Sequence, residues 1–550
     1  MTMLLAYTLL MSSVLQPSSW QAELPIFRLA WKDPGKSIPK APDLISKVLT
    51  TSDGGVIAVG STSNPKGSSY ETDVLIRKHT EFGVLVWEKR FDTFGKGKQD
   101  SATDAVLDGS GNLYVAISVA LGNYDGFTLC KISAADGSIL WTNSVDTGNE
   151  RATAYDLVID KQGFPVQVGG FGSNAQAEIF ATKWSPDGKT VWTHRWKSPD
   201  GKVNQARGAA VSSNGDVYLV GVSETAAGGE DAIAIRLDGA SGTPKWAKHV
   251  RGAGIARDSA TAVAVDEAGD AYITGSLYLQ GSTNSVFAAR LDAATGSVKW
   301  QTPLLEPRNA GGEGVGIHVD RNGVTMGASM NLLSANGPDL TVSKFSLEGK
   351  EVWRANANSA DALIDEASAF TVDKYGNAYI AGGSTKRNGM PNAFVARVNP
   401  EGKIVWQYLD SPTAPSQARP GSVAVDDDSG TVYVGSGSVD STDTDWSLIA
   451  IEQSPEAQPL NSQVLLGKTV NLQLTSQSAP AFVQQSRFSR GVEWSTEVPK
   501  RGKFSPSPAR FDAPTDAPGP VDFGFTLTRK GLRSSSSTIK VNVMKPPPGR

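Results

Sequence analysis

Apolar and polar residues alternate in short runs along most of this chain. The stretch from residue 258 to residue 300 shows the pattern most clearly, and it reads DSATAVAVDEAGDAYITGSLYLQGSTNSVFAARLDAATGSVKW. Its four apolar runs alternate with the period of a β-strand, and turn residues such as Gly, Asp and Asn separate them. The stretch therefore predicts a four-stranded antiparallel meander that ends near Trp300.

This unit recurs with a nearly constant period, because the tryptophans that end successive copies lie 51 to 54 residues apart. A period of this length with four strands per copy favours a β-propeller. We predict that each indole packs against the neighbouring copy, since burial of a large aromatic ring contributes strongly to stability. The aligned tryptophans are Trp87, Trp141, Trp192, Trp246, Trp300, Trp353 and Trp406.

The last copy of the unit lacks its fourth strand. The turn after the first strand occurs eight times, but the copy that begins near residue 422 has only three strands. A matching fourth-strand segment, PIFRLAWKDPG with Trp31, stands near the N-terminus. We therefore predict an all-β fold in which residues 24–460 form an eight-bladed propeller. The N-terminal strand would complete the last blade, which leaves no open edge to aggregate.

The chain changes character at both ends. Beyond residue 460 the period vanishes, and short alternating runs over residues 461–545 predict a small β-sandwich, with residues 546–550 as a disordered tail. Residues 1–23 contain an apolar core at positions 3–15 and resemble a secretory signal peptide, although no Lys or Arg precedes that core. No later apolar run approaches the ~20 residues of a membrane span. We expect an exported protein, located in the periplasm, at the cell surface or in the medium.

Charge and composition exclude several kinds of site. The net charge is −4, which gives no reason to expect nucleic-acid binding. Cys130 is the only cysteine and lies in an apolar run, so we expect a buried hydrophobic residue and no disulfide. The four histidines fall in different copies without ligand spacing, and the repeated turn aspartates are explained by turn geometry, so no metal site is predicted.

Two family resemblances follow from these residues. The repeated unit, with DSATAVAVD and the later FAARLD, resembles the bacterial β-propeller repeat of secreted and cell-surface proteins (SBBP type). The segment RLDAATGSVKW, residues 290–300, is similar to the tryptophan-docking motif of eight-bladed pyrroloquinoline quinone (PQQ) dehydrogenase-like propellers. Together the two resemblances cover residues 25–455. The segments VEWSTE, GKFSPSPARFDAPT and TIKVNV resemble a bacterial Ig-like module, which implies a spacer or adhesive unit.

The quinoprotein resemblance implies an alternative function. Such enzymes hold PQQ and a calcium ion, use an Asp as catalytic base and often carry a disulfide between adjacent cysteines. Cys130 has no partner for that disulfide, and no nucleophile motif such as G-x-S-x-G is present. We therefore expect a non-enzymatic binding or scaffold protein without a cofactor, and we keep a PQQ-dependent oxidoreductase as the alternative. A lyase or carbohydrate-active propeller, with Asp258 and Glu313 as facing carboxylates, is a third hypothesis.

The ligand is expected at the loop face, because the loops that lead into each first strand differ most among the copies. At the mouth of the channel these loops place charges of both signs, and arginines there can hold a carboxylate by two hydrogen bonds. The alternative is that these charges only pair with one another. We expect a protein or glycan partner; the sequence does not predict the oligomeric state. The predicted rim residues are Asp100, Arg151, Arg207, Arg257, Asp258, Glu313, Asp365, Glu366 and Arg419.

Overall fold

We describe the fold from a computed structural model. Within the described residues all regular secondary structure is β-strand, numbered β1 to β39, and no helix there is long and apolar enough to cross a membrane. The predicted signal peptide and C-terminal tail lie outside these residues. The described residues are 26–33, 43–63, 71–93, 99–120, 125–146, 150–172, 177–198, 204–225, 229–252, 257–279, 284–304, 311–331, 338–359, 362–386, 391–410, 416–440, 444–454, 460–465, 469–471, 493–496, 503–506, 509–529 and 532–545.

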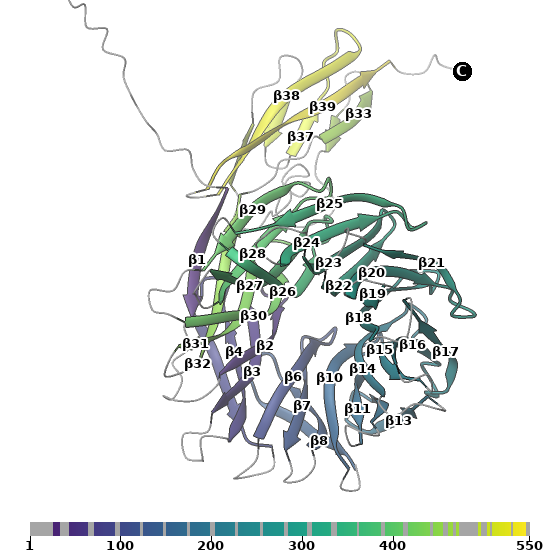
Figure 1. The fold of residues 1–550 in the computed structure, drawn as a ribbon. Coiled ribbons are helices and arrows are strands. Elements are labelled where there is room, and N and C mark those ends of the chain that lie inside the picture. Colours follow the sequence, from purple (N-terminus) through teal and green to yellow (C-terminus); the bar gives the residue numbers. More distant parts are fainter. Residues whose placement is uncertain are drawn as a thin grey trace, which may run out of the picture.

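Most strands form antiparallel meanders, each of which we call a blade and name after its innermost strand. The innermost strands are β2 (Leu44–Thr50), β6 (Gln99–Leu107), β10 (Ala152–Ile159), β14 (Asn204–Val211), β18 (Ser259–Val265), β22 (Gly312–Asp320), β26 (Ala362–Val372) and β30 (Ser416–Val425). They follow one another around a central channel, and β30 lies beside β2, as in a β-propeller (Figure 1). A single parallel pair, Thr72 with Gln99, joins the β2 and β6 blades into one eight-stranded sheet.

The second and third strands of each blade carry the core. Their apolar runs are buried on both faces, because each blade packs between two others. The second strands are β3 (Val56–Ser63), β7 (Leu113–Ala120), β11 (Pro165–Phe171), β15 (Val217–Glu224), β19 (Ala271–Tyr278), β23 (Gly323–Asn331), β27 (Ala378–Lys386) and β31 (Val432–Asp440). The third strands are β4 (Thr72–His79), β8 (Asp125–Ile132), β12 (Glu178–Trp184), β16 (Glu230–Leu237), β20 (Asn284–Leu291), β24 (Pro338–Phe345), β28 (Pro391–Val398) and β32 (Thr444–Gln453).

The outer strands are mostly exposed or partly buried, as expected for the rim of a propeller. They are β5 (Leu85–Phe91), β9 (Ile139–Val145), β13 (Thr190–Trp196), β17 (Pro244–Val250), β21 (Val298–Pro303), β25 (Glu351–Ala357) and β29 (Ile404–Leu409), and in the β30 blade the N-terminal strand β1 (Phe27–Asp33). β1 pairs antiparallel with β32, the last strand of the ring. The two ends of the ring are thus hydrogen-bonded within one sheet.

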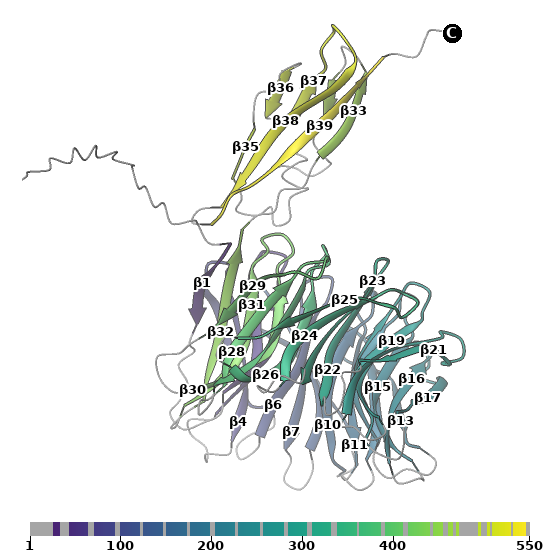
Figure 2. The same cartoon turned by 45° about the horizontal axis from the view of Figure 1, so that its top comes forward.

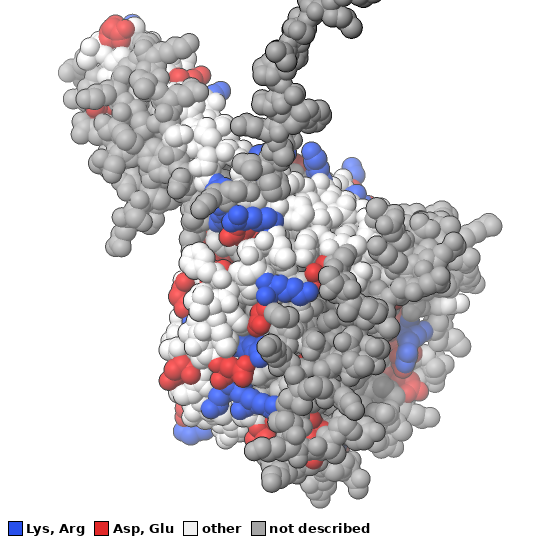
Figure 3. All heavy atoms as spheres, turned by 90° about the vertical axis from the view of Figure 1, so that its left-hand side faces the viewer, with Lys and Arg blue, Asp and Glu red and all other residues white. Residues whose placement is uncertain are grey.

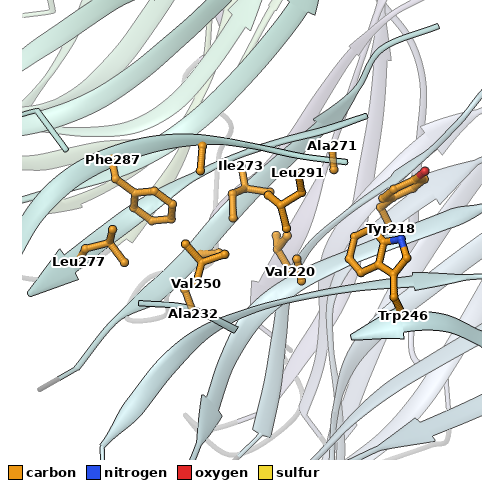
Figure 4. Packing of buried hydrophobic residues seen from close by; sticks show 13 residues of the cluster. Tyr218, Val220, Ala232, Trp246, Val250, Ala271, Ile273, Leu277, Phe287 and Leu291 are labelled. Carbon is orange, nitrogen blue, oxygen red and sulfur yellow. The ribbon is translucent and has the colours of Figure 1, made fainter. Parts of the chain in front are cut away.

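Neighbouring blades pack through apolar side chains. Between the β14 and β18 blades, Tyr218 and Trp246 lie with Ile273 and Leu291 in one buried cluster (Figure 4). Burying a side chain the size of leucine contributes roughly 1.5–3 kcal/mol. Similar clusters lie between the other blades, so the ring has a series of interfaces in place of one central core.

A polar contact at the rim also ties each blade to the next. Trp300 Nε1 donates to the carbonyl of Leu347, in the turn before the next outer strand, at 2.9 Å, and Arg290 Nη1 donates to the same oxygen at 2.9 Å. The carbonyl oxygen therefore accepts two hydrogen bonds at the junction between the blades. The same indole-to-carbonyl bond joins Trp31 to Glu81, Trp87 to Ala134, Trp141 to Pro186, Trp192 to Gly239, Trp246 to Ala293 and Trp353 to Pro400.

The turn that supplies this carbonyl also requires a glycine. Gly349 has a φ of +85°, and a Cβ there would come within 2.5 Å of the Trp300 ring. Only glycine combines the left-handed backbone with this close approach to the indole. The T-G pair before Trp300 in the repeated unit is the same feature, since Gly296 lies on Trp246 in the same way.

The ring closure differs from the other junctions. β32 and β1 are far apart in the sequence, so no turn joins these two paired strands to supply a carbonyl. The side chain of Gln453 takes its place: its Oε1 accepts from Trp406 Nε1 at 2.8 Å and from Arg397 Nη1 at 2.9 Å. Its Nε2 donates to the Tyr379 hydroxyl at 3.1 Å and to the Gly430 carbonyl. This fully buried amide therefore links the β26 blade to the closing blade.

Salt bridges lie on the outside of the same seam. Arg28 in β1 pairs with Glu452 in β32 at 2.6 Å, and Lys32 pairs with Asp410 at 2.6 Å. On the side of the molecule that includes β1, basic and acidic side chains lie beside one another (Figure 3). Exposed pairs of this kind contribute about 0–1 kcal/mol each, so the buried contacts dominate the closure.

The last strands form two further sheets. One has the order β33 (Leu460–Leu465), β39 (Ser535–Met544), β38 (Gly519–Thr528), β35 (Glu493–Thr496); the other has the order β34 (Thr469–Asn471), β37 (Ala509–Asp512), β36 (Lys503–Pro506). The sheets face each other, because Phe511 in β37 stacks on Phe523 in β38 at 6.0 Å between ring centroids. Both ribbon views place them next to the ring closure (Figures 1 and 2). There Arg529, only 8% exposed, donates to the backbone carbonyl of Gln453 at 3.2 Å.

We predict that Gln453→Ala lowers the free energy of unfolding by about 2–4 kcal/mol. The indole of Trp406 and the guanidinium of Arg397 would lose a shared buried acceptor, while the strand backbone would be unchanged. Urea unfolding measures the change, and hydrogen exchange of the β1 amides should rise with it. Gln301→Ala is the matched control, because the Gln301 amide makes an exposed hydrogen bond to the Arg251 carbonyl, and its loss should cost less than about 1 kcal/mol. Equal losses for the two variants would contradict the closure role.

Candidate functional site

Every innermost strand carries a β-bulge at the same level of the channel. In β14, for example, the register with β15 shifts between Ala206 and Gly208, so Arg207 has no residue opposite it in β15. A bulge re-aims its side chain and interrupts the regular ladder. The bulged residues line the channel, and they are Ser46, Thr103, Tyr155, Arg207, Thr261, Val315, Ser368 and Gly421.

The channel holds a cavity of about 730 Å³. Residues from all of the innermost strands named above line it, and its volume lies within the range of small-molecule sites. Its wall is uneven. Charged side chains gather on β2, β6 and β10, whereas small or apolar residues such as Gly208, Ala262 and Ala369 occupy the corresponding positions on β14, β18 and β26.

Three charges on the polar side form one network. Lys47 Nζ lies 2.7 Å from Asp104 Oδ1, and burial, together with the charge of Asp104, raises the pKa of Asp156 to about 7. Burial alone would lower the pKa of Lys47, but the two carboxylates outweigh it and the pKa is raised. Each carboxylate also accepts a backbone N–H of the next blade: Leu157 N donates to Asp104 at 3.0 Å and Ala209 N to Asp156 at 2.7 Å. These acids therefore hold the ring together.

The sequence reasoning missed this network. The three residues occupy the position after the bulge in three successive copies, where other copies have Gly, Ala or Ser. Aligning the copies on the first strand in place of the tryptophan would have found them. The signal is a change from small to charged residues at one repeated position.

Three of the predicted rim acids are buried. Asp100, Asp258 and Asp365 are each 1–2% exposed, and burial raises the pKa of each carboxyl. Each carboxylate accepts a backbone N–H from the residue two positions after the preceding outer strand, namely Thr93, Gly252 and Ser359. They fasten the loops that lead into the blades.

Two of the predicted arginines lie at one groove with a predicted acid. Arg207 Nη1 is 3.2 Å from Glu313 Oε1, and Arg257 holds Glu230 by two hydrogen bonds of 2.6 and 3.1 Å. With Ser259 and neighbouring residues they line a groove of about 560 Å³. The charges at this place do pair with one another. The side chains remain accessible, with 71% of Arg257 and 36% of Arg207 exposed.

The remaining predicted residues lie in different surroundings. Glu366 lines a second groove of about 470 Å³ together with Glu313. Arg151 is exposed just before β10. Arg419 lies in β30 opposite Gly437, and its side chain lies outside the described part of the structure.

The carboxylate pair of the lyase hypothesis has unequal environments. Asp258 uses both oxygens for backbone N–H groups, from Gly252 at 2.8 Å and Tyr278 at 2.6 Å, and is 2% exposed. The side chain of Glu313 is 48% exposed and paired with Arg207. A general acid and a base or nucleophile must both reach the bond between two sugars, and Asp258 is turned to its own loop.

The residues present do not fit PQQ with calcium. Among the described residues no group of three or more His, Cys, Asp or Glu side chains comes together as a metal site. The acids in the channel accept backbone N–H groups, and Cys130 is fully buried, with burial raising its thiol pKa to about 11. The channel carboxylates that could serve as calcium ligands thus accept hydrogen bonds from the backbone of the next blade.

Comparison with known proteins supports the fold. Residues 181–322 match a family described as outer membrane protein assembly factor BamB. Together with the four-stranded sheets, this match supports a PQQ-like β-propeller. The comparison with curated proteins gave no match.

Several solved structures are similar to this chain at low identity and low TM-score. The quinohemoprotein alcohol dehydrogenase of Comamonas testosteroni is 11% identical, with a TM-score of 0.43 over 78% of this chain and 76% of that chain. The WD40 domain of SCAP from fission yeast is 10% identical, with a TM-score of 0.42 over 78% and 98%. A Bacteroides caccae protein of unknown function is 13% identical, with a TM-score of 0.31 over 52% and 90%. Similarity at this level carries no argument about function.

We predict that Asp156→Asn flattens the pH dependence of stability between about pH 4 and pH 7. The carboxyl keeps its proton up to about pH 7 in the folded chain but loses it near pH 3.8 when unfolded. The folded state therefore binds more protons in this window, and the free energy of unfolding falls as the pH rises. Asparagine can still accept from Ala209 but does not titrate.

Urea midpoints at several pH values measure this effect, which is worth roughly 1.4 kcal/mol for each unit of pKa difference. Asp187→Asn is the control, since hydrogen bonds with Ser185 and Lys189 lower the pKa of that exposed carboxyl to about 2, outside the window. If Asp156→Asn keeps the full decline of the wild-type chain, Asp156 is not its source.

Proposed function

We propose that this protein is an exported, non-enzymatic β-propeller that binds a protein or glycan partner through its loop face. In this proposal residues 24–460 form eight blades closed by β1, and residues 461–545 form an Ig-like β-sandwich that acts as a spacer. Residues 1–23 would direct export and be removed. The predicted SBBP-type character of the repeat belongs to the same proposal.

The accessible ion pairs at the channel mouth carry this proposal. Arg207 and Arg257 lie at one groove, and each is held by a glutamate while it stays open to solvent. Such exposed pairs contribute only about 0–1 kcal/mol to stability. Arginines held in place at the edge of a groove are typical anchors of protein interfaces, because little side-chain entropy is lost when a partner binds.

The surrounding acids favour binding over catalysis. Asp100, Asp258 and Asp365 accept backbone N–H groups, and Asp104 and Asp156 link neighbouring blades. A general acid or base must reach a substrate proton within hydrogen-bond distance. Carboxylates already committed to the backbone serve the fold instead.

We predict that Arg207→Ala combined with Arg257→Ala weakens partner binding at least tenfold. A screen of glycans and of candidate exported proteins, with the purified chain immobilised, provides the measurement. Arg195→Ala is the matched control: Arg195 is 43% exposed and paired with Glu178, but it lies on the outer strand β13. Unchanged binding by the double variant would remove this groove from the proposal.

The alternative of a PQQ-dependent oxidoreductase has its own test. The purified chain incubated with PQQ and calcium should keep no cofactor absorbance after gel filtration and should not reduce a dye with alcohol or sugar substrates. An authentic quinoprotein apoenzyme treated in parallel is the positive control. Retained absorbance together with dye reduction would favour the enzyme.

A further inference from the structure

A buried carboxylate without a partner lies at the junction of the β22 and β26 blades. Asp339, the second residue of β24, is only 7% exposed. Within the described residues its side chain makes no hydrogen bond and no ion pair. Buried charges in proteins are normally paired or bound to a cation, because their transfer from water to the interior is unfavourable. An orphaned buried carboxylate is therefore typical of a site for an ion or an ordered water.

A second carboxylate approaches Asp339 from the next blade. Asp365 in β26 is 1% exposed. Its Oδ2 accepts the Ser359 N–H at 3.0 Å, whereas its Oδ1 is buried and accepts no hydrogen bond within the described residues. Burial, together with the charge of Asp365, raises the pKa of Asp339 to about 6, so this carboxyl is mainly ionised at pH 7. We call Asp339 and Asp365 the acid pair.

The junction of the β14 and β18 blades contains an equivalent pair of acids with an arginine beside it. Asp231 lies at the position of Asp339 and is close enough to Asp258 to raise the pKa of that carboxyl, although burial is the larger cause. Arg251 Nε lies 2.5 Å from Asp231 Oδ2. Both oxygens of Asp258 accept backbone N–H groups. The negative charge at this junction is thus balanced by the protein itself.

The junction of the β2 and β6 blades has the same arrangement. Asp73 lies near Asp100, and Arg90 Nε is 2.8 Å from Asp73 Oδ2. Asp100 Oδ1, like the corresponding oxygen in β26, accepts no hydrogen bond within the described residues. The feature that the two junctions share is therefore the arginine on the third-strand acid.

The β22 blade has no arginine at either of these places. Counted from the tryptophan of the outer strand, Asn356 and Asn358 stand where the other two blades have Arg90 and Arg251. Both asparagines are neutral and exposed. No described cationic side chain therefore balances the charge of the acid pair.

We propose that the acid pair binds one Ca²⁺ ion, which takes the place of the arginine. Both oxygens of Asp339 and Oδ1 of Asp365 are the ligands that the structure offers, and oxygen donors suit a hard cation. Calcium tolerates irregular geometry better than magnesium, which favours it where the ligands come from separate blades. This inference goes beyond the proposed function and does not depend on it.

The affinity should be modest. Among the described residues no third His, Cys, Asp or Glu joins the pair. Water and backbone carbonyl groups commonly complete the shell of six to eight oxygens around calcium, and sites with few charged ligands bind weakly. We expect a dissociation constant of roughly 10⁻⁴–10⁻³ M.

Calcium titration of the purified full-length chain, treated with EDTA and dialysed, tests this inference. Isothermal titration calorimetry should give one ion per chain, and the urea midpoint should rise with calcium, because an ion that binds only the folded state stabilises it. Mg²⁺ should bind at least tenfold more weakly. Absence of calcium binding by the wild-type chain, or equal binding of magnesium, overturns the assignment.

Asp339→Asn should weaken calcium binding at least tenfold and remove the calcium dependence of the urea midpoint. The variant should fold, because this side chain makes no hydrogen bond within the described residues. Asp231→Asn is the matched control: Asp231 occupies the same position two blades earlier but is paired with Arg251, so calcium binding should be unchanged. If Asp339→Asn binds calcium as tightly as the wild-type chain, the ion lies elsewhere and the inference fails.

Asn358→Arg supplies the cation that the β14 blade already has. It should raise the urea midpoint of the calcium-free chain and reduce the further rise on addition of calcium, because the guanidinium then balances the acid pair. A different result would indicate that the pair shares a proton instead of an ion: Asp339→Asn would raise the midpoint by the same amount with and without calcium. That outcome overturns the calcium site.

Discussion

The hydrogen bond from a tryptophan indole to a carbonyl of the next blade is the contact on which this ring depends. Each blade buries its apolar faces only against its neighbours, so any displacement at one junction exposes two surfaces. The bond from Trp300 to Leu347 fixes that junction at the rim, and Arg290 shares the acceptor. A buried carbonyl without donors would cost about 1–3 kcal/mol. The tryptophan and the turn glycine that permits the contact therefore recur together.

The closing junction shows what this constraint demands where the chain has no turn to offer. Gln453 supplies a side-chain oxygen in place of a backbone carbonyl, and its amide nitrogen donates to two more buried groups. Arg529 from the C-terminal sheets donates to the backbone oxygen of the same residue. One residue thus joins the β26 blade, the closing blade and the C-terminal sheets. The C-terminal sheets thus contribute a hydrogen bond to the closing junction itself.

The sequence predicted the features that depend on local alternation and on repetition. The strands of the unit ending at Trp300 and the pairing of the Trp31 segment with the last blade follow from period and turn chemistry. The alternation of apolar and polar residues does not, however, reveal how deeply a polar side chain is buried. Asp258 reads as a rim charge but is buried on backbone N–H groups, and the bulge that exposes Arg207 depends on packing between blades. The Lys47 network was missed for the same reason, since its partners come from separate copies.

The hydrogen-bond partners of the charged residues differ between the channel and its mouth. In the channel, Asp104 and Asp156 are each bound to a backbone N–H of the next blade, so a ligand that drew them away would weaken a junction. At the mouth, the hydrogen bonds that Arg207 and Arg257 make within the described residues go to the side chains of Glu313 and Glu230. A charged side chain that is hydrogen-bonded across a junction cannot also bind a ligand without weakening that junction. Because these two arginines accept no such role in a junction, our proposal places recognition at the mouth and not in the channel.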